Sequence, residues 1–267
     1  MQDLLEMRLV VDGWMTGALN MARDESLAAS VASGGTPTLR LYRFRPSCIS
    51  IGRFQEYPGE IDVDGCAARG IEVVRRPTGG LAILHQDDFT YSLTLPRKEA
   101  SAYYREEYFN IAAAGIIEAL GAVGVPAGAA DHPTRGKGPG TWCFDSAYGV
   151  DLEWRGRKVC GSAQRVGPGS VLQHGSVFLS SQEGILEGLV AVSPEAEPKG
   201  TPQVSLEEAA GSRVSWERLA DAFAEGFARA LEVTLVTGTL DSGEDAVASK
   251  LRDDRYAEAG WLAGTRR

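Results

Sequence analysis

Strict alternation of apolar and polar residues from Phe89 to Leu95 limits what this chain can fold into more than any other feature. Aromatic residues or leucine occupy every second position, with threonine or serine between them, as in a strand with one buried face. A second alternating run, 150–154, leads through Arg155-Gly156-Arg157 into another strand-like segment, 158–160. Strands joined by such short turns pair antiparallel, so the sequence predicts hairpins within a sheet.

The segment that contains the first run, 73–96, begins with VVRRPTGGLAILH and has the composition of two strands joined by a turn. A turn of this kind needs at most one glycine in a left-handed conformation. The second member of the Gly79-Gly80 pair therefore indicates a place where backbone N–H groups lie directly against a ligand. A hairpin with solvated arginines is an equally good interpretation of this stretch taken alone.

Amphipathic spacing predicts helices on either side of the strand-rich middle of the chain. One helix is expected over 103–120, and another is expected after Ser215, where leucine and phenylalanine recur in helical register. Further helices are expected at 18–32, at 61–68 and near Ser242, the last with Asp245 in its cap. Because the strands come in hairpins and no GxGxxG follows the first of them, the sequence predicts an α/β (α+β) fold with a mixed sheet flanked by helices. A doubly wound dinucleotide fold is not expected.

Length and composition exclude several classes of protein. The chain has 267 residues, of which 43% are hydrophobic and 24% charged, and we expect one domain over 1–267 with its core at about 33–250. A formal net charge of -9 argues against a nucleic-acid binder, which needs a basic surface. No apolar run approaches the ~20 residues of a membrane span, and the N-terminus does not resemble a secretory signal. We therefore expect a cytoplasmic protein without a membrane partner.

The four cysteines are widely spaced, with no CxxC pair and no histidine at metal-finger spacing. Neither a disulfide framework nor a metal site is predicted, and no cofactor is expected. Cys48, Cys66 and Cys160 lie in strand-like or helix-like surroundings and are expected to be packed thiols. Cys143 differs, because it ends the Gly/Pro-rich stretch GAADHPTRGKGPGTWCF, whose basic residues favour a thiolate.

Lys158 is the cation best placed to activate the Cys143 thiol, because the hairpin after the loop can bring the two together. An unperturbed thiol, with a pKa of about 8.5, is only a few per cent ionised at pH 7, whereas a pKa near 7 makes it roughly half ionised. The alternatives are a solvated strand lysine at 158 and a packed thiol between Trp142 and Phe144.

Three motifs in series resemble those of the lipoate–protein ligase and octanoyltransferase family, namely RRPTGGLAILH, CFDSAYGVDLEWRGRKVCGSAQR and VLQHGS. The resemblance covers nearly the whole chain and implies the catalytic fold shared with biotin ligases. The ligases of this family, which spend ATP on a free acid, have a pattern resembling RRxSGGGAVxHDxGN. This chain has Leu81 in place of the third glycine, and Asp87-Asp88 follow where Gly-Asn is expected. A loop with fewer glycines and more acids is a poorer place for nucleotide phosphates.

The CFDS motif instead resembles the octanoyltransferase branch that serves the glycine-cleavage H protein. The resemblance implies that Cys143 carries the acyl group and that Lys158 lowers its pKa. It also implies an acyl-binding tunnel lined by Arg76, Gly79, Gly80, Leu81, His85, Gly161, Ser162 and Ala163, with Gln164 and His174 as weaker candidates. The arginines of the first motif are expected to face the phosphate-bearing arm of the carrier.

The sequence therefore predicts an octanoyltransferase of protein lipoylation. Octanoyl-acyl carrier protein is the expected donor, Cys143 the site of an acyl-thioester intermediate, and a lipoyl domain such as that of the glycine-cleavage H protein the acceptor. One alternative is an amidotransferase that moves octanoyl or lipoyl groups between lipoyl domains. The others are an ATP-dependent lipoate ligase and a non-catalytic module that binds an acyl carrier.

Overall fold

The structure, a computed structural model, describes residues 5–55, 61–97, 104–130, 151–185, 187–189 and 203–264. Its helices are α1 (Gly17–Ala32), α2 (Val63–Ala68), α3 (Tyr104–Ala122), α4 (Leu206–Ala210), α5 (Trp216–Leu231), α6 (Ser242–Leu251) and α7 (Ala259–Leu262), with a π-helical turn, η1 (Arg252–Tyr256). Its strands are β1 (Glu6–Met15), β2 (Thr38–Phe44), β3 (Cys48–Ile51), β4 (Glu72–Arg75), β5 (Ile83–His85), β6 (Asp88–Pro96), β7 (Gly128–Ala129), β8 (Leu152–Trp154), β9 (Arg157–Val166), β10 (Ser170–Phe178) and β11 (Thr234–Gly238).

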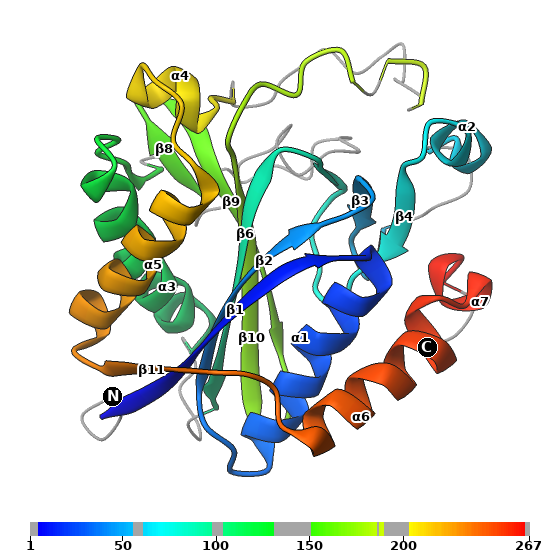
Figure 1. Ribbon diagram of the computed structural model, residues 1–267, viewed down its shortest axis with the longest axis horizontal. Helices are drawn as coiled ribbons and strands as arrows, with labels where there is room; N and C mark the ends of the chain where they lie inside the picture. Colours follow the sequence, from blue (N-terminus) through cyan, green and yellow to red (C-terminus); the bar gives the residue numbers. More distant parts are fainter. Residues whose placement is uncertain are drawn as a thin grey trace.

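A large twisted sheet crosses the molecule, with α3 and α5 on one side and α1 and α6 on the other (Figure 1). Within the described residues its order is β11-β1-β2-β6-β10-β9-β8-β7, and a smaller sheet has the order β4-β3-β5. β1 runs parallel to β2 and β11, whereas the pairs from β2 to β7 are antiparallel. The predicted mixed sheet flanked by helices is confirmed.

One predicted hairpin is confirmed and the other is wrong. β8 and β9 pair through a turn in which Arg155 and Gly156 both have positive φ, at 52° and 73°, as a two-residue hairpin requires. β4 and β5 do not pair with each other, because β3 lies between them. β4 is parallel to β3 and β5 is antiparallel to it, so the connection 76–82 carries the chain from one side of β3 to the other.

The helices α3 and α5 cover the apolar face of the large sheet, and their register was predicted correctly. Phe223 of α5 packs against Phe89 of β6 with ring centroids 4.5 Å apart. The predicted cap at Ser215 is confirmed, since its hydroxyl accepts the backbone N–H of Arg218. The cap of α6 is Asp241, which forms a reciprocal capping box with Glu244, so the predicted cap at Ser242 and Asp245 was one residue late.

The opposite, polar face of β6 is also buried, contrary to the predicted half-buried strand. Thr90, Ser92 and Thr94 are each at most 2% exposed. The reason is that α1 packs on this face and residues of the small sheet border it, so polar side chains there must find hydrogen-bond partners inside the protein. Those partners form the site described below.

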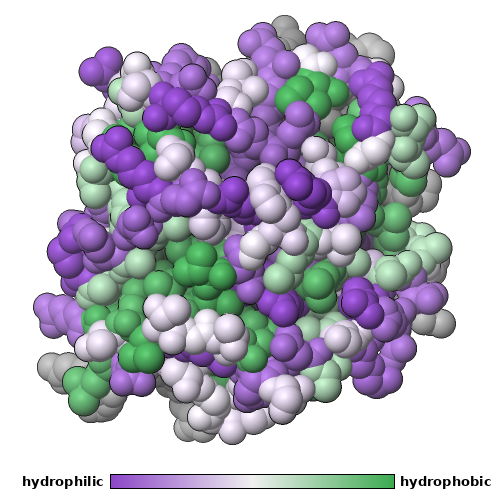
Figure 2. Space-filling model, in the orientation of Figure 1, coloured by the Kyte–Doolittle hydropathy of each residue, from purple (hydrophilic) through white to green (hydrophobic). Residues whose placement is uncertain are grey.

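The face shown in Figure 2 carries hydrophobic residues at the lower left, where Figure 1 places β1 and β11. Val11 of β1 and Val236 of the edge strand β11 are 49% and 44% exposed. None of the described helices is both long and apolar enough to cross a bilayer.

Two helical glycines give opposite predictions for replacement by alanine. A Cβ at Gly226 of α5 would lie 2.7 Å from the carbonyl oxygen of Gly115 and 2.8 Å from the backbone nitrogen of Ala119, both on α3, which cannot move aside easily. A Cβ at Gly121, also on α3, meets nothing within 4 Å. In urea unfolding, we expect Gly226→Ala to lower the free energy of unfolding by about 2 kcal/mol. Gly121→Ala should raise it by up to about 1 kcal/mol. A neutral Gly226→Ala would contradict the close helix contact.

Candidate active site

The buried polar face of β6 and β10 borders a narrow cavity between the large and small sheets. The cavity has a volume of about 30 Å³ and is lined by Met21, Tyr42, Ser50, Arg76, Ile83, His85, Thr90, Gly161, Ser162, Ala163, His174, Gly175 and Ser176. Small residues of β9 form one wall, and two histidines and an arginine form another. The cavity therefore combines small side chains with several polar groups.

The structure brings together most of the residues that the sequence analysis assigned to substrate binding. Arg76, His85, Gly161, Ser162 and Ala163 all line this cavity. Gly79, Gly80 and Leu81 lie in the turn beside it, where a Cβ on Gly80 would be 3.9 Å from the Cβ of Ala163. Gln164 lies outside the lining and donates to the side chain of Gln173 at 3.2 Å. Proximity is thus established, whereas binding of a substrate by these residues stays a prediction.

Arg76 is bound to the protein's own backbone, and the prediction that it faces the phosphate-bearing arm of a carrier stays a prediction. Its side chain is buried, and its guanidinium donates to the carbonyl oxygens of Gly79, Leu81 and Ser50 at 2.7–2.8 Å. Its Nε also donates to the hydroxyl of Thr78 at 3.2 Å. A buried guanidinium needs acceptors for its N–H groups, and here backbone carbonyls supply them. Arg76 therefore holds the 78–81 turn in place.

Arg75 is used in the same way on the other side of β4. It is 3% exposed and donates only to backbone carbonyls among its described contacts, those of Gly52, Arg53, Gln55, Trp261 and Leu262. It ties the turn after β3 to α7.

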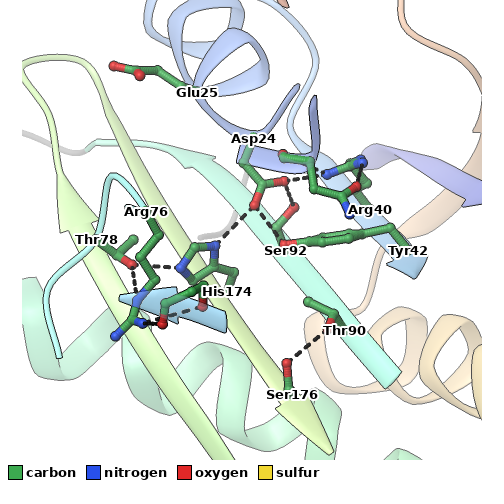
Figure 3. A network of polar contacts seen from close by, with 12 residues as sticks. Asp24, Glu25, Arg40, Tyr42, Arg76, Thr78, Thr90, Ser92, His174 and Ser176 are labelled. Atoms are coloured by element: carbon green, nitrogen blue, oxygen red, sulfur yellow. Dashed lines mark hydrogen bonds and ion pairs between the residues drawn. The ribbon is translucent and has the colours of Figure 1, made fainter. Parts of the chain in front are cut away.

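His174 of β10 connects this turn to the helix α1 (Figure 3). Its Nδ1 lies 3.0 Å from the carboxylate of Asp24, and its Nε2 lies 2.6 Å from the hydroxyl of Thr78. Because a carboxylate accepts only, Nδ1 carries the proton, and Nε2 accepts from Thr78. Thr78 in turn accepts from Arg76, so the donors run in one direction from Arg76 to Asp24.

Asp24 is the centre of the network, and the sequence analysis missed it. Its carboxylate accepts from Arg40 at 2.8 Å, Tyr42 at 2.9 Å, Ser92 at 2.8 Å and His174. Burial alone would raise the pKa of Asp24, but the hydrogen bond from His174 and the charge of Arg40 outweigh it and lower the pKa. The signal in the sequence was an acid spaced three residues from both Met21 and Leu27, on the core-facing side of α1.

His85 of β5 forms a second set of hydrogen bonds, which joins the small sheet to β6. Its Nδ1 donates to Asp88 at 2.7 Å, its Nε2 accepts from Ser50 at 2.9 Å, and its ring stacks on Phe44. Asp88 is buried and also accepts from Thr90, whereas Asp87 pairs with Arg213 near the surface. Asp88 therefore belongs to the buried network, whereas Asp87 lies near the surface.

Lys158 is a buried lysine of β9 and not a solvated one. It is 1% exposed, and its Nζ lies 2.8 Å from the carboxylate of Asp151, which is also buried. Asp151 is the first described residue after the segment 131–150. Cys143 belongs to that segment and so lies outside the described residues. The predicted pairing of Cys143 with Lys158 is therefore untested.

The other three cysteines are buried, as predicted. Burial raises the pKa of Cys48 well above its ordinary value and also raises that of Cys66. Cys160 is 1% exposed and belongs to the core beneath α3 and α5. Among the described residues, no three histidine, cysteine, aspartate or glutamate side chains are grouped to hold a metal ion.

The turn needs a left-handed residue at Gly80 but not at Gly79. Gly80 has a φ of +88°, and a Cβ there would lie 2.8 Å from Nη2 of Arg76, whereas a Cβ on Gly79 meets nothing within 4 Å. We expect Gly80→Ala to lower the free energy of unfolding by about 1–2 kcal/mol. The matched variant Gly79→Ala should change it by less than about 0.5 kcal/mol. Equal effects in denaturant titrations would contradict this account of the turn.

His174 makes stability depend on pH. Burial lowers its pKa below the ordinary value of 6.5, although Asp24 opposes that shift. The unfolded chain then binds this proton more readily, so the stabilisation is complete above pH 6.5 and is lost as the pH falls toward the folded pKa. We expect wild type to lose up to about 1.4 kcal/mol per pH unit from this group during acidification from pH 7.5 to 5.

His174→Gln provides the control, because glutamine can donate to Asp24 and accept from Thr78 without titrating. The stability difference between wild type and His174→Gln should narrow as the pH falls. Parallel curves of unfolding free energy against pH would show that His174 does not titrate in this way.

Known proteins resemble this chain over most of its length. Residues 16–228 match the family model described as the lipoyl protein ligase A/B catalytic domain. Three curated relatives share the name octanoyltransferase LipM. The protein from Symbiobacterium thermophilum is 38% identical, over 95% of this chain and 97% of its own length. Those from Exiguobacterium sibiricum and Brevibacillus brevis are 37% and 33% identical, over 91% and 95% of this chain and 94% and 97% of their own lengths.

Solved structures confirm the predicted catalytic fold. Lipoate-protein ligase A bound with ATP has a TM-score of 0.83 at 22% identity, covering 97% of this chain and 99% of its own. The bipartite lipoate protein ligase of Thermoplasma acidophilum has a TM-score of 0.82 at 22% identity, covering 98% of each chain. At this identity the structures show the fold, and the sequence relatives and the family model show kinship. The chain belongs to the lipoyl protein ligase A/B catalytic-domain family.

Proposed function

We infer that this protein is an octanoyltransferase of protein lipoylation. The observation that carries this conclusion is the shared name of the relatives, octanoyltransferase LipM, at 33–38% identity over nearly all of the chain. The protein is thus an acyltransferase. We further propose octanoyl-acyl carrier protein as the donor, a thioester on Cys143 as the intermediate, and a lysine of a lipoyl domain, such as that of the glycine-cleavage H protein, as the acceptor.

The burial of the other cysteines supports Cys143 as the nucleophile. A thiolate is the reactive form of cysteine, and burial in apolar surroundings disfavours it. Cys48, Cys66 and Cys160 are all buried, and none of them lines the cavity. Cys143 is the remaining cysteine of the chain.

The Lys158–Asp151 ion pair supports a specific role for Lys158 beside Cys143, beyond a general contribution to the positive charge of the region. A buried ammonium is costly unless a carboxylate compensates it, and Asp151 does so at 2.8 Å. Asp151 also lies eight positions after Cys143 in the sequence. In this proposal, Lys158 stabilises the Cys143 thiolate, while Asp151 fixes the position of the ammonium.

The proposed chemistry needs no ATP, because the donor thioester is already activated. The Cys143 thiolate adds to the thioester carbonyl, a new C–S bond forms, and the bond to the sulfur of the carrier breaks. The neutral amine of the acceptor lysine then adds to the same carbonyl carbon. The bond to Cys143 breaks, the amine proton passes to the departing sulfur, and the product is an amide. The cavity beside Gly161, Ser162 and Ala163 is the proposed place for the acyl chain.

The mass shift of an apo lipoyl domain, measured with three donors, tests the function. We expect modification with octanoyl-acyl carrier protein in the absence of ATP and Mg²⁺. Modification only with octanoate plus ATP would make the protein a ligase, and modification only with an octanoylated lipoyl domain would make it an amidotransferase. Binding of the carrier without any transfer would make it a non-catalytic module.

Variants of the same enzyme test the intermediate. Cys143→Ser should abolish both the acyl-enzyme seen by intact mass and the transfer, whereas Cys66→Ala, at a buried helical site, should retain both. Lys158→Met should raise the pH at which iodoacetamide alkylates Cys143. An active Cys143→Ser variant would rule out the thioester intermediate, and an unchanged alkylation profile would remove Lys158 from the site.

A further inference from the structure

The backbone carbonyls of the 78–81 turn all face the protein side of the turn. The carbonyl of Thr78 accepts from the backbone N–H of Arg53 at 2.8 Å. Those of Gly79 and Leu81 accept from Arg76, each at 2.7 Å. The carbonyl of Gly80 packs against Gly52, where a Cβ would overlap its oxygen.

Peptide geometry then fixes the direction of the N–H groups. In a planar trans peptide the N–H of one residue points opposite to the C=O of the residue before it. The N–H groups of Gly79, Gly80 and Leu81 therefore point away from Arg53, Arg76 and Gly52. Within the described part of the chain, none of these three N–H groups has a hydrogen-bond acceptor. Three successive donors are thus left available on one turn.

These donors lie where a ligand can reach them. Gly80 is exposed, and it approaches Ala163 of the cavity wall. The guanidinium of Arg76 lies behind the turn and adds positive potential on the side opposite the N–H groups. Successive N–H groups around a residue with positive φ form a concave site for an anionic oxygen, and Gly80 has such a φ, at +88°.

We propose that the N–H groups of Gly79, Gly80 and Leu81 form an oxyanion hole for the acyl group, and that Arg76 is the positioning residue that builds it. The inference rests on the proposed function. Addition of the Cys143 thiolate, or later of the acceptor amine, moves the carbonyl π electrons onto oxygen, and the three donors bind that oxygen. Collapse of the intermediate returns the pair to the C=O bond as the C–S bond breaks. Donors fixed in place before the reaction stabilise this charge most effectively.

The same donors also suit the phosphate of a carrier arm, so the test must separate the two anionic oxygens. Replacement of Leu81 by its α-hydroxy acid, using nonsense suppression, turns its peptide into an ester, which removes the N–H and keeps the side chain. The carbonyl altered by this change is that of Gly80, which accepts no hydrogen bond in the described structure. Leu5→α-hydroxy acid is the matched control, because Leu5 is 79% exposed and its N–H also has no acceptor among the described residues.

The readout is the single-turnover rate of acyl-enzyme formation, followed by intact mass, with two donors. One donor is octanoyl-acyl carrier protein and the other is octanoyl-N-acetylcysteamine, which has no phosphate. We expect the Leu81 ester to lower the rate at saturating donor by about 100-fold with both donors, the scale for one oxyanion-hole donor, with little change in KM. The Leu5 ester should behave as wild type.

Two results would overturn the inference without touching the proposed function. An unchanged rate with both donors would show that the N–H of Leu81 is not used. An increase in KM that occurs only with the carrier-linked donor would show that the turn binds the phosphate and not the acyl oxygen. Arg76→Lys, which keeps the charge but cannot hold three carbonyls, should lower the rate with both donors as well. A wild-type protein that forms no acyl-enzyme would instead overturn the proposed function, and this inference with it.

Discussion

The buried carboxylate of Asp24 is the interaction on which the arrangement of this protein depends. It joins α1 to three neighbouring strands, through Arg40 of β2, Ser92 of β6 and His174 of β10. Arg40 and Asp24 are both fully buried. Such a pair does not guarantee net stability, but loss of one partner leaves an uncompensated buried charge at a cost of about 3–5 kcal/mol. The pair therefore specifies one position of α1 on the sheet.

That position determines the candidate site. With α1 fixed, the polar face of β6 and β10 is covered, and its side chains must satisfy one another. His174 connects Asp24 to Thr78 through hydrogen bonds, and Arg76 connects Thr78 to the backbone of the turn. The apolar face behind these strands packs on α3 and α5 and supplies a rigid support. The site is thus built from regular elements, with only its last turn irregular.

The charged residues at the site show that the charge of a side chain does not by itself reveal the role of that side chain. Arg75 and Arg76 look like ligands for an anion, yet both are buried and bind backbone carbonyls. Lys158 looks like a solvated strand residue, yet it is buried against Asp151. Each buried charge is met by acceptors or by an opposite charge, because an uncompensated buried charge is costly. Burial thus makes the two arginines structural residues, whereas it fixes the Lys158 ammonium against Asp151.

The sequence by itself determined the longer helices, the β8–β9 hairpin, strand β6, the mixed sheet, the family, and the set of small and polar residues that gather around the cavity. These follow from periodicity, caps and ordered motifs, which are local properties of the chain. The tertiary structure alone decided that β3 separates β4 from β5, that the polar face of β6 is buried, and that Asp24 orients His174. The last contact joins residues 150 positions apart, and no local pattern encodes such a distance. Hydrogen-bond partners of buried groups are chosen by packing, so they become known only when the layers are assembled.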